Sequence, residues 1–350
     1  MIRVLIVEDS PVVRDFLVHI LGSDPQLEVI GTAVDGRHAV EAAQRLRPDV
    51  ITMDIHMPQM NGFDATRCIM ETAPTRIVIV SGSSSTKEIA TTFHALEAGA
   101  LAVVRRPAGI GHPDHEATAG ELLQTVKLMS EVVVVRRWPP ARRVTPVFER
   151  AREPELKPAV VEIRLVAVGA STGGPPALQN ILAGLPKNLG VPILVVQHIA
   201  PGFTEGLAEW LAASTGFPVR VAADGERPAP GQVFIAPEGF QPGIRRDGSV
   251  VLARGEPENG HCPSISYLFR SVAEAFGPSA VGVLLTGMGR DGAAELKLMK
   301  ERGAITIAQD RDSSIVHGMP GEAIRLGAAT HVLPLDQIAA ALRKLTGKQQ

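Results

Sequence analysis

The chain has very little cysteine, with only Cys68 and Cys262 among its 350 residues. Two cysteines in unrelated sequence contexts exclude a disulfide framework and a cysteine-rich zinc site, and they fit a reducing compartment. An excess of charge of one sign is also absent, because the formal net charge is −2 and the isoelectric point is about 6.6. This balance does not favour binding to nucleic acid or to an anionic membrane.

Long apolar runs are missing as well, and none is long enough to span a bilayer. The N-terminal segment reaches the acidic residues Glu8 and Asp9 too early for a signal peptide. We therefore expect a cytoplasmic protein without membrane insertion. The length of the chain suffices for two domains of ordinary size.

The first half, from Arg3 to about Leu128, alternates short apolar runs with helix-length amphipathic stretches. This alternation predicts a parallel sheet covered by helices on both faces. The apolar runs comprise residues 4–7, 29–33, 50–53, 77–80 and 102–104.

Acidic residues follow two of these runs: Glu8 and Asp9 after the first, and Asp54 after the third. Ligands of such sheets gather outside the carboxyl ends of the strands, so we expect these carboxylates to lie together. Their repulsion would be relieved by a hard divalent cation such as Mg²⁺. Each acid alone is a typical turn or cap residue. Because Ser81 ends the fourth run and a basic residue ends the fifth, phosphoryl chemistry is the favoured interpretation.

Between residues 129 and 158 the periodicity fades into a segment rich in arginine and proline, which includes Arg136-Arg137-Trp138-Pro139-Pro140. This composition predicts a solvated linker, which divides the chain into domains of residues 1–128 and 159–347. A basic run can also bind nucleic acid. We favour a hinge or a dock for an acidic surface, because aromatic residues are not interleaved with the arginines.

The second half begins with an apolar run, residues 165–170, that ends at Ser171 and is followed by Thr172-Gly173-Gly174-Pro175-Pro176. The run predicts a buried parallel strand. The two prolines suit the first turn of a helix, whose free amides would point towards Ser171. Residues 169–173 also match the spacing of a nucleophile elbow, a strained turn that exposes a serine oxygen. A glycine-rich turn or a phosphate loop are the alternatives.

Two further apolar runs end near chemically useful side chains. Residues 191–197 lead into His198, and Asp291 follows the run 281–285. Because strand–helix–strand crossovers are right-handed, Ser171 and His198 should share one edge of the sheet. A serine hydroxyl needs an imidazole base held by a carboxylate, so these three residues form a candidate triad. Alternatively, His198 satisfies a loop carbonyl and Asp291 caps the next helix.

Three other histidines are possible bases: His261, His317 and His331. His261 lies in a loop-like stretch that could line a cleft, whereas His331 precedes an edge-like run, which indicates a structural role. The order serine, histidine, aspartate differs from the common order of α/β-hydrolases, in which the acid precedes the histidine.

The first half resembles the receiver domains of response regulators. The resemblance rests on Val-Glu-Asp-Ser at 7–10, Met-Asp-Ile-His-Met-Pro-Gln-Met-Asn-Gly at 53–62 and Arg-Arg-Pro at 105–107. It implies a flavodoxin-like fold with Asp54 as phosphoacceptor and a histidine kinase as phosphodonor. It further implies a Mg²⁺ site made by Glu8, Asp9, Asp54 and the His56 backbone carbonyl. Ser81 and Arg106 are the implied contacts of the phosphoryl group.

Two positions depart from the receiver pattern. Arg106 stands where the family normally has lysine, and Val103 where it usually has an aromatic residue. The arginine side chain is bulkier and planar, and it carries a fork of donors rather than a compact ammonium. We therefore expect Arg106 to make phosphorylation less effective than lysine would.

The second half resembles the chemotaxis protein-glutamate methylesterases. Matching pieces include Gly-Ala-Ser-Thr-Gly-Gly at 169–174, Val-Val-Gln-His at 195–198 and Leu-Leu-Thr-Gly-Met-Gly-Arg-Asp-Gly at 284–292. The resemblance implies a doubly wound, mostly parallel, Rossmann-like catalytic domain. The site residues that it implies are the triad Ser171, His198 and Asp291, the Met288 amide in an oxyanion hole, and Thr172 and His261 nearby.

The implied reaction is hydrolysis of glutamate γ-methyl esters on the cytoplasmic helices of chemoreceptors, with deamidation of receptor glutamine as a related activity. Hydrolysis should need no cofactor. The receiver is expected to cover the catalytic rim until Asp54 is phosphorylated. Alternatives are a methylesterase of a pathway outside chemotaxis, or a regulatory binding module without hydrolase activity. A DNA-binding regulator is disfavoured, because the second half has no compact basic recognition helix.

Two positions of the second half differ from the family, with Gln241 where histidine is common and Ser266 where aspartate is common. We expect neither side chain to touch the triad. Both substitutions bear instead on substrate contact or interdomain packing.

Overall fold

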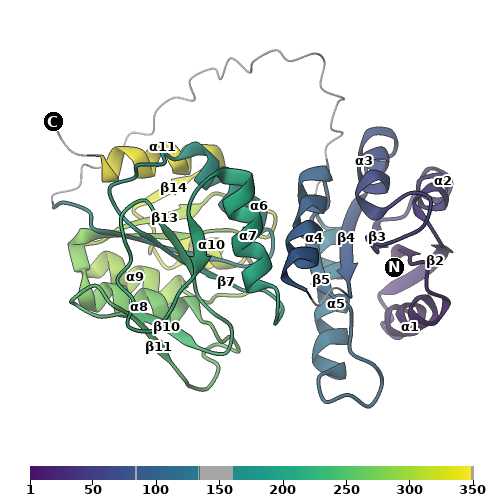
Figure 1. Cartoon of the computed structure of the whole chain (residues 1–350), viewed down its shortest axis with the longest axis horizontal. Coiled ribbons are helices and arrows are strands. Elements are labelled where there is room, and N and C mark those ends of the chain that lie inside the picture. The colour runs from purple at the N-terminus through teal and green to yellow at the C-terminus, as the bar shows by residue number, and fades with distance from the viewer. Residues whose placement is uncertain (83–84, 133, 135–160, 348–350) are drawn as a thin grey trace, which may run out of the picture. The chain divides into compact units, whose positions relative to one another are not determined.

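The computed structural model of the chain describes residues 1–82, 85–132, 134 and 161–347 (Figure 1). The chain divides into two compact units, Met1–Val147 and Phe148–Gln350. Most of the linker expected over 129–158 falls outside the described residues. The domain end expected at residue 128 lies inside a helix that continues to Ser130. Among the described residues, no helix combines the length and the apolar character needed to cross a membrane.

The N-terminal unit has a five-stranded parallel sheet in the order β2-β1-β3-β4-β5. This order is the flavodoxin-like one, and each expected apolar run lies in a strand. The elements are β1 (Ile2–Val7), α1 (Pro11–Gly22), β2 (Leu27–Ala33), α2 (Gly36–Leu46), β3 (Val50–Met53), α3 (Gly62–Thr72), β4 (Arg76–Ser81), α4 (Thr86–Ala98), β5 (Ala102–Arg105) and α5 (His115–Ser130).

The helices of this unit form two groups: α1 packs against α5, and α3 packs against both α2 and α4. The strands between them are buried, and Val4–Val7 of β1 are almost completely inaccessible to solvent. The strand order reverses between β1 and β3, and the carboxyl edge at such a reversal is where open α/β sheets bind their ligands. Glu8, Asp9 and Asp54 follow those strands directly.

The C-terminal unit has a seven-stranded parallel sheet in the order β14-β13-β12-β6-β7-β9-β8, and a separate antiparallel hairpin of β10 and β11. This confirms the doubly wound, mostly parallel fold. The elements are β6 (Leu165–Ala170), α6 (Gly174–Gly184), β7 (Ile193–Gln197), α7 (Thr204–Thr215), β8 (Val219–Val221), β9 (Val233–Ile235), β10 (Gln241–Ile244), β11 (Val250–Ala253), α8 (Ile265–Ala275), β12 (Ala280–Leu284), α9 (Ala293–Glu301), β13 (Ile305–Gln309), α10 (Met319–Arg325), β14 (His331–Leu333) and α11 (Leu335–Thr346).

Successive side chains of the central strands point to opposite faces of the seven-stranded sheet, and helices cover both faces. Leu165 and Ala167 of β6 belong to a core cluster with α8, α9 and α10. The intervening Val166 and Val168 are buried as well. Their side chains face the opposite layer, where α6 packs against both α7 and α11.

The first strand of this unit, β6, lies between β7 and β12. The chain winds outwards from β6 through β7 and later returns to β12 on the other side. Strand order therefore reverses at β6, the position at which open α/β sheets bind their ligands. The loops after β6, β7 and β12 share this edge, and they carry Ser171, His198 and Asp291.

The approach of α8 to β6 generates a testable prediction. A Cβ atom added to Gly169 would lie 2.4 Å from Cγ2 of Ile265, the first residue of α8. We expect Gly169→Ala to lower the free energy of unfolding by about 1–3 kcal/mol, because the buried isoleucine must move. In contrast, Gly190→Ala should be close to neutral, since its added methyl group meets nothing nearer than 3.7 Å. Urea unfolding of both variants tests this; equal stability of the two would contradict it.

Candidate active site and phosphorylation site

Ser171 follows β6 directly and is fixed by its backbone. Its N–H donates to the Thr286 carbonyl at 3.1 Å, and its carbonyl accepts from Gly174 N at 2.8 Å. Helix α6 begins there with Pro175 in its first turn, as expected. The expectation of a strained turn at the serine is wrong, however, because Ser171 does not have a positive φ. The left-handed conformation is taken instead by Gly173, with φ +79°, at the entry to the helix.

His198 occupies the tip of the neighbouring strand. The β6–β7 register pairs Ala170 with Gln197, and His198 N donates to the Ala170 carbonyl at 2.9 Å. The buried Gln197 amide donates to the carbonyls of both Ser171 (2.7 Å) and His198 (2.8 Å). Gln197 therefore joins the two strand tips. The sequence analysis missed this role, although a polar residue inside an apolar run was a signal for it.

The imidazole of His198 is held by Asp291, which lies 2.9 Å from its Nε2 atom. Both side chains are buried, with exposed fractions of 8% and 2%. An ionised carboxylate only accepts, so Nε2 carries the proton and Nδ1 has a free lone pair. Nδ1 is itself buried and has no hydrogen-bond partner among the described residues. The ring is thus arranged to take a proton at Nδ1.

The carboxylate of Asp291 lies at the N-terminus of α8 rather than capping α9. It accepts from the amides of Ile265 (2.7 Å) and Ser266 (3.2 Å) and from the Ser264 hydroxyl (2.9 Å). The first amides of a helix have no partner within the helix and favour an anion. The expectation that Ser266 does not touch the triad is therefore wrong, because Ser266 stands in the first turn of α8.

A further donor comes from the loop before α8, where Asn259 Nδ2 lies 3.0 Å from Asp291 Oδ1. Burial alone would raise the pKa of Asp291, but hydrogen bonds from His198, Asn259 and Ser266 outweigh it. They hold the pKa of Asp291 far below its usual range. The carboxylate consequently stays ionised throughout the neutral range.

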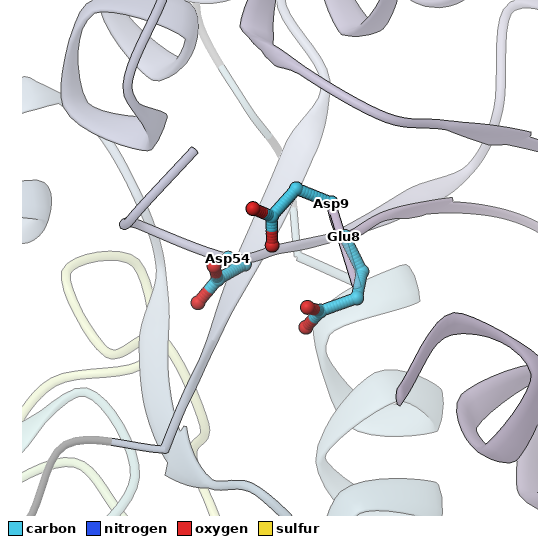
Figure 2. Close-up of side chains that lie close together, drawn as sticks. All are labelled: Glu8, Asp9 and Asp54. Atoms are coloured by element: carbon cyan, nitrogen blue, oxygen red, sulfur yellow. The ribbon is translucent and has the colours of Figure 1, made fainter. Parts of the chain in front are cut away.

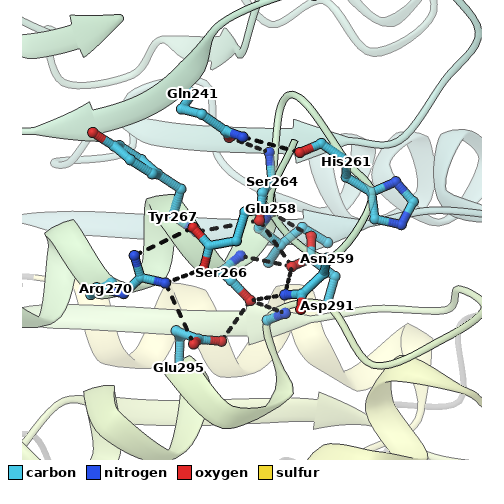
Figure 3. Close-up of polar contacts among 12 residues, drawn as sticks. Gln241, Glu258, Asn259, His261, Ser264, Ser266, Tyr267, Arg270, Asp291 and Glu295 are labelled. Atoms are coloured by element: carbon cyan, nitrogen blue, oxygen red, sulfur yellow. Dashed lines mark hydrogen bonds and ion pairs between the residues drawn. The ribbon is translucent and has the colours of Figure 1, made fainter. Parts of the chain in front are cut away.

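Gln241 does not contact the triad, in agreement with the expectation, but it supports the residues that do. Figure 3 shows its amide beside the loop: Oε1 accepts from Ser264 N at 2.9 Å, and Nε2 donates to the His261 carbonyl at 3.0 Å. The side chain is almost completely buried. Gln241 thus positions Ser264, which donates to Asp291.

His261 stacks face to face on His198, with ring centroids 3.7 Å apart and an interplanar angle of 9°. Burial lowers the pKa of His261, and the neighbouring His198 lowers it further. A neutral ring is therefore favoured in the stack. Of the other two histidines, His317 pairs in a β-bridge with Gly287, which lies beside Ser171, whereas His331 is in the edge strand β14.

The loop after β12 brings Met288 next to Ser171. A Cβ on Gly287 would lie 2.6 Å from the Ser171 Cβ, so this close approach requires glycine. Gly287 N donates to the Val316 carbonyl, and the Gly287 carbonyl accepts from the amides of Gly318 and Met319. Thr172 anchors the same loop, because its carbonyl accepts from the Thr286 hydroxyl at 3.0 Å. Gly287, the residue before Met288, is thereby fixed beside the serine.

An open cleft of about 650 Å³ adjoins Asp291. Ser171 and His198 are not among its lining residues, but His261, which stacks on His198, is. Its lining residues are Asn259, His261, Gly289, Arg290, Asp291, Gly318 and Glu322.

In the N-terminal unit, the side chains of Glu8, Asp9 and Asp54 lie close together (Figure 2), and one carboxylate oxygen from each lies within 4.8 Å of the other two. The Arg106 guanidinium lies 3.6 Å from Glu8 and 3.9 Å from Asp54. Burial and the nearby Asp54 carboxylate raise the pKa of Glu8 to about 7, although Arg106 acts to lower it. Burial raises the pKa of Asp54 too. The single guanidinium lies near two of the three carboxylates and cannot balance the charge of all three.

The two units match separate family models. Residues 166–342 match the CheB methylesterase family, and residues 4–112 match the response regulator receiver domain. The chain belongs to the CheB methylesterase family. The family expected from the sequence motifs is thereby confirmed in both halves of this CheB-family protein.

Relatives of this CheB-family protein match it over its whole length. A protein-glutamate methylesterase/protein-glutamine glutaminase of Nitrosospira multiformis is 60% identical over 100% of this chain and 98% of its own. A protein with the same description from Geobacter metallireducens is 55% identical over 99% of both chains. The crystal structure of the Thermotoga maritima CheB methylesterase catalytic domain is 39% identical. It has a TM-score of 0.51 and covers 53% of this chain and all of that one.

The receiver site of this CheB-family protein fits a hard divalent cation. Three carboxylates converge, and Glu8 Oε2 is buried without a hydrogen-bond partner among the described residues. Oxygen ligands of this kind suit Mg²⁺, which retains several waters. Ser81 is buried at the end of β4, with its hydroxyl 3.4 Å from that of Thr92, and the His56 side chain is exposed.

The hydrogen bonds to Asp291 predict how stability depends on pH. We expect Asp291→Asn to lower the free energy of unfolding of the catalytic unit by about 2–4 kcal/mol at neutral pH, because an amide nitrogen must face buried donors. The folded-state pKa of Asp291 is depressed from 3.8. Its stabilising contribution is therefore complete above that value and is lost as the pH falls below it through the folded-state pKa.

The measurement is urea unfolding at a series of pH values, followed by fluorescence of the buried Trp210. A Trp138→Phe background removes the only other tryptophan. The difference in stability between the parent protein and the Asp291→Asn variant should shrink as the pH falls below about 4. A difference that stays constant down to about pH 3 would contradict the prediction.

Proposed function

We propose that this protein hydrolyses glutamate γ-methyl esters on the cytoplasmic helices of chemoreceptors, giving glutamate and methanol. Family membership and the shared description of its relatives support this reaction. The mechanism rests on how the two nitrogens of the His198 imidazole are bonded. Its Nε2 atom is bound to Asp291, and its Nδ1 atom is without a partner among the described residues, at the strand tip next to Ser171.

In the first half of the reaction, the Ser171 hydroxyl oxygen attacks the ester carbonyl carbon while His198 Nδ1 takes its proton. Asp291 stabilises the imidazolium and holds the ring in the required tautomer. The Met288 amide would bind the tetrahedral oxyanion, a contribution of about 3 kcal/mol for one such donor. Methanol leaves with the proton from His198, and the glutamyl group remains esterified to Ser171.

In the second half, His198 takes a proton from water, whose oxygen attacks the acyl-enzyme. Collapse of this intermediate returns the proton to Ser171 and releases the glutamate carboxylate. Deamidation of receptor glutamine follows the same path, with ammonia as the first leaving group. Thr172 supports the site through its backbone carbonyl, which accepts from the Thr286 hydroxyl. His261 supports it through its ring, which stacks on His198.

We further propose that a histidine kinase supplies a phosphoryl group to Asp54 and that this modification raises esterase activity. Mg²⁺, held by Glu8, Asp9, Asp54 and the His56 carbonyl, would neutralise charge on the transferring group. Arg106 already lies near two of these carboxylates, and Ser81 ends the neighbouring strand β4. The added charge acts by favouring one of two states of the protein.

Two alternatives are distinguishable by assay. In the first, the substrate is a receptor-like protein outside chemotaxis; in the second, the C-terminal unit binds a partner without hydrolysis. Methanol release from candidate methylated receptors separates them, because a binding module releases none. The buried His198–Asp291 pair favours the hydrolase, since a binding module has no need of an oriented imidazole.

Ser171→Ala tests the nucleophile. We expect methanol release from a methylated receptor to fall at least about 10³-fold, because only the oxyanion donors and substrate binding remain. Phosphorylation of Asp54 by acetyl phosphate should be unchanged, and this serves as the folding control for the receiver. Substantial remaining esterase activity would defeat the assignment of Ser171.

Arg106→Lys tests the phosphorylation switch. The planar guanidinium spans Glu8 and Asp54, whereas an ammonium group concentrates its charge at one point. We expect the lysine variant to gain more esterase activity from acetyl phosphate than the parent protein does. The measurement is the ratio of methanol release with and without the phosphodonor. An unchanged or smaller ratio would count against a weakening effect of arginine.

A further inference from the structure

A polar network connects the surface of α8 with the catalytic imidazole. Arg270 of α8 pairs with Glu258 through both of its terminal nitrogens, and the Nη1–Oε2 distance is 3.3 Å. The same guanidinium lies 3.7 Å from Glu295 of α9, whose other carboxylate oxygen accepts from the Ser266 hydroxyl at 2.6 Å. Figure 3 shows Arg270 between these two carboxylates, away from the His261 ring.

Glu258 is the first residue of a tight four-residue turn that is closed by hydrogen bonds between its ends. Glu258 and His261 exchange two backbone hydrogen bonds of 3.0 Å, and the residues between them, Asn259 and Gly260, have φ values of +54° and +83°. Positive φ at both central positions is the geometry of the two-residue turn that Asn-Gly favours. An ion pair that fixes Glu258 therefore fixes all four residues.

This turn makes two contacts with the triad. Asn259 donates to Asp291 at 3.0 Å and to the Ser266 hydroxyl at 3.1 Å. The His261 ring stacks on His198 at 3.7 Å. The hydrogen bond from His198 to Asp291 fixes the Nε2 atom but does not by itself set the plane of the ring. The flat His261 ring stacked on its face restrains that plane and so helps to direct Nδ1.

We infer that the Glu258–Arg270 ion pair is a positioning device for catalysis, which orients His198 by holding the 258–261 turn against it. This inference rests on the proposed esterase function, and it adds two residues that neither line the cleft nor hydrogen-bond to the triad. Exposure argues against a mainly structural role. The Arg270 and Glu258 side chains are 40% and 29% exposed, and ion pairs at such positions contribute little to folding.

Arg270→Ala is the principal test. We expect kcat for methyl ester hydrolysis to fall about tenfold to a hundredfold, because small misplacements of a catalytic group cost rates of this size. KM should change by less than about twofold, since neither Arg270 nor Glu258 lines the cleft. Arg270→Lys should recover most of the lost rate because it keeps the charge opposite Glu258. The matched control is Arg227→Ala, which breaks an exposed ion pair with Asp247 in the same unit.

A second readout needs no receptor. A fluorophosphonate reacts with an activated serine: Oγ of Ser171 bonds to phosphorus, fluoride leaves, and the hydroxyl proton passes to His198. The labelling rate should fall in Arg270→Ala and in Glu258→Gln, and the double variant should be no slower than the slower single variant. Glu258→Gln keeps the size of the side chain and the backbone turn, so it remains informative if the alanine variant is unstable. Circular dichroism and the urea midpoint establish folding.

The possible outcomes distinguish failure of the positioning role from failure of the proposed esterase function. Labelling and kcat of both variants equal to those of Arg227→Ala would overturn the positioning role while leaving the esterase intact. A loss of rate that appears entirely in KM would overturn it too. If the unaltered protein is labelled by the fluorophosphonate but hydrolyses no receptor ester, the substrate is wrong and the labelling rates still decide the inference. No labelling of the unaltered protein would refute both proposals.

Discussion

The catalytic unit is organised around the carboxylate of Asp291 at the N-terminus of α8. Two helix amides, a hydroxyl, an amide side chain and the imidazole all donate to it. A buried carboxylate without such donors would take up a proton instead, and the imidazole would then lose its anionic partner. The packing of α8 against β6 thus fixes the charge state on which the orientation of His198 depends.

The two acidic sites of the chain show opposite solutions to burial. Asp291 accepts from several donors, so its pKa falls and it is ionised throughout the neutral range. Glu8 and Asp54 have few donors, so burial raises the pKa of each, and a neighbouring carboxylate raises it further: Asp54 beside Glu8, and Asp9 beside Asp54. The first arrangement suits a group that must never change during a reaction. The second suits one that exchanges partners, such as a cation and a phosphoryl group.

The strands and the edge on which the site residues lie were predictable, because buried parallel strands read as apolar runs and polar residues follow them. Residues 50–53, for example, are both the expected run and the whole of β3. The supporting contacts were not predictable. Ser266 contacts Asp291 because α8, from a distant part of the chain, directs its first turn at the loop after β12. Gln197 was visible only as a polar exception within a strand. Hydrogen bonds across long sequence separations leave no local periodicity to read.

The order of the three candidate triad residues along the chain follows from the winding of the sheet. Because β6 is both the first strand and the point of reversal, its loop must meet those of β7 and of the returning strand β12. Any residues brought to this point therefore appear in the order of those strands, which here gives serine, histidine and aspartate. The long excursion between β7 and β12 also contains the 258–261 turn and α8. That insertion supplies the donors for Asp291 and the ring stacked on His198, so the segment separating two triad members in sequence joins them in space.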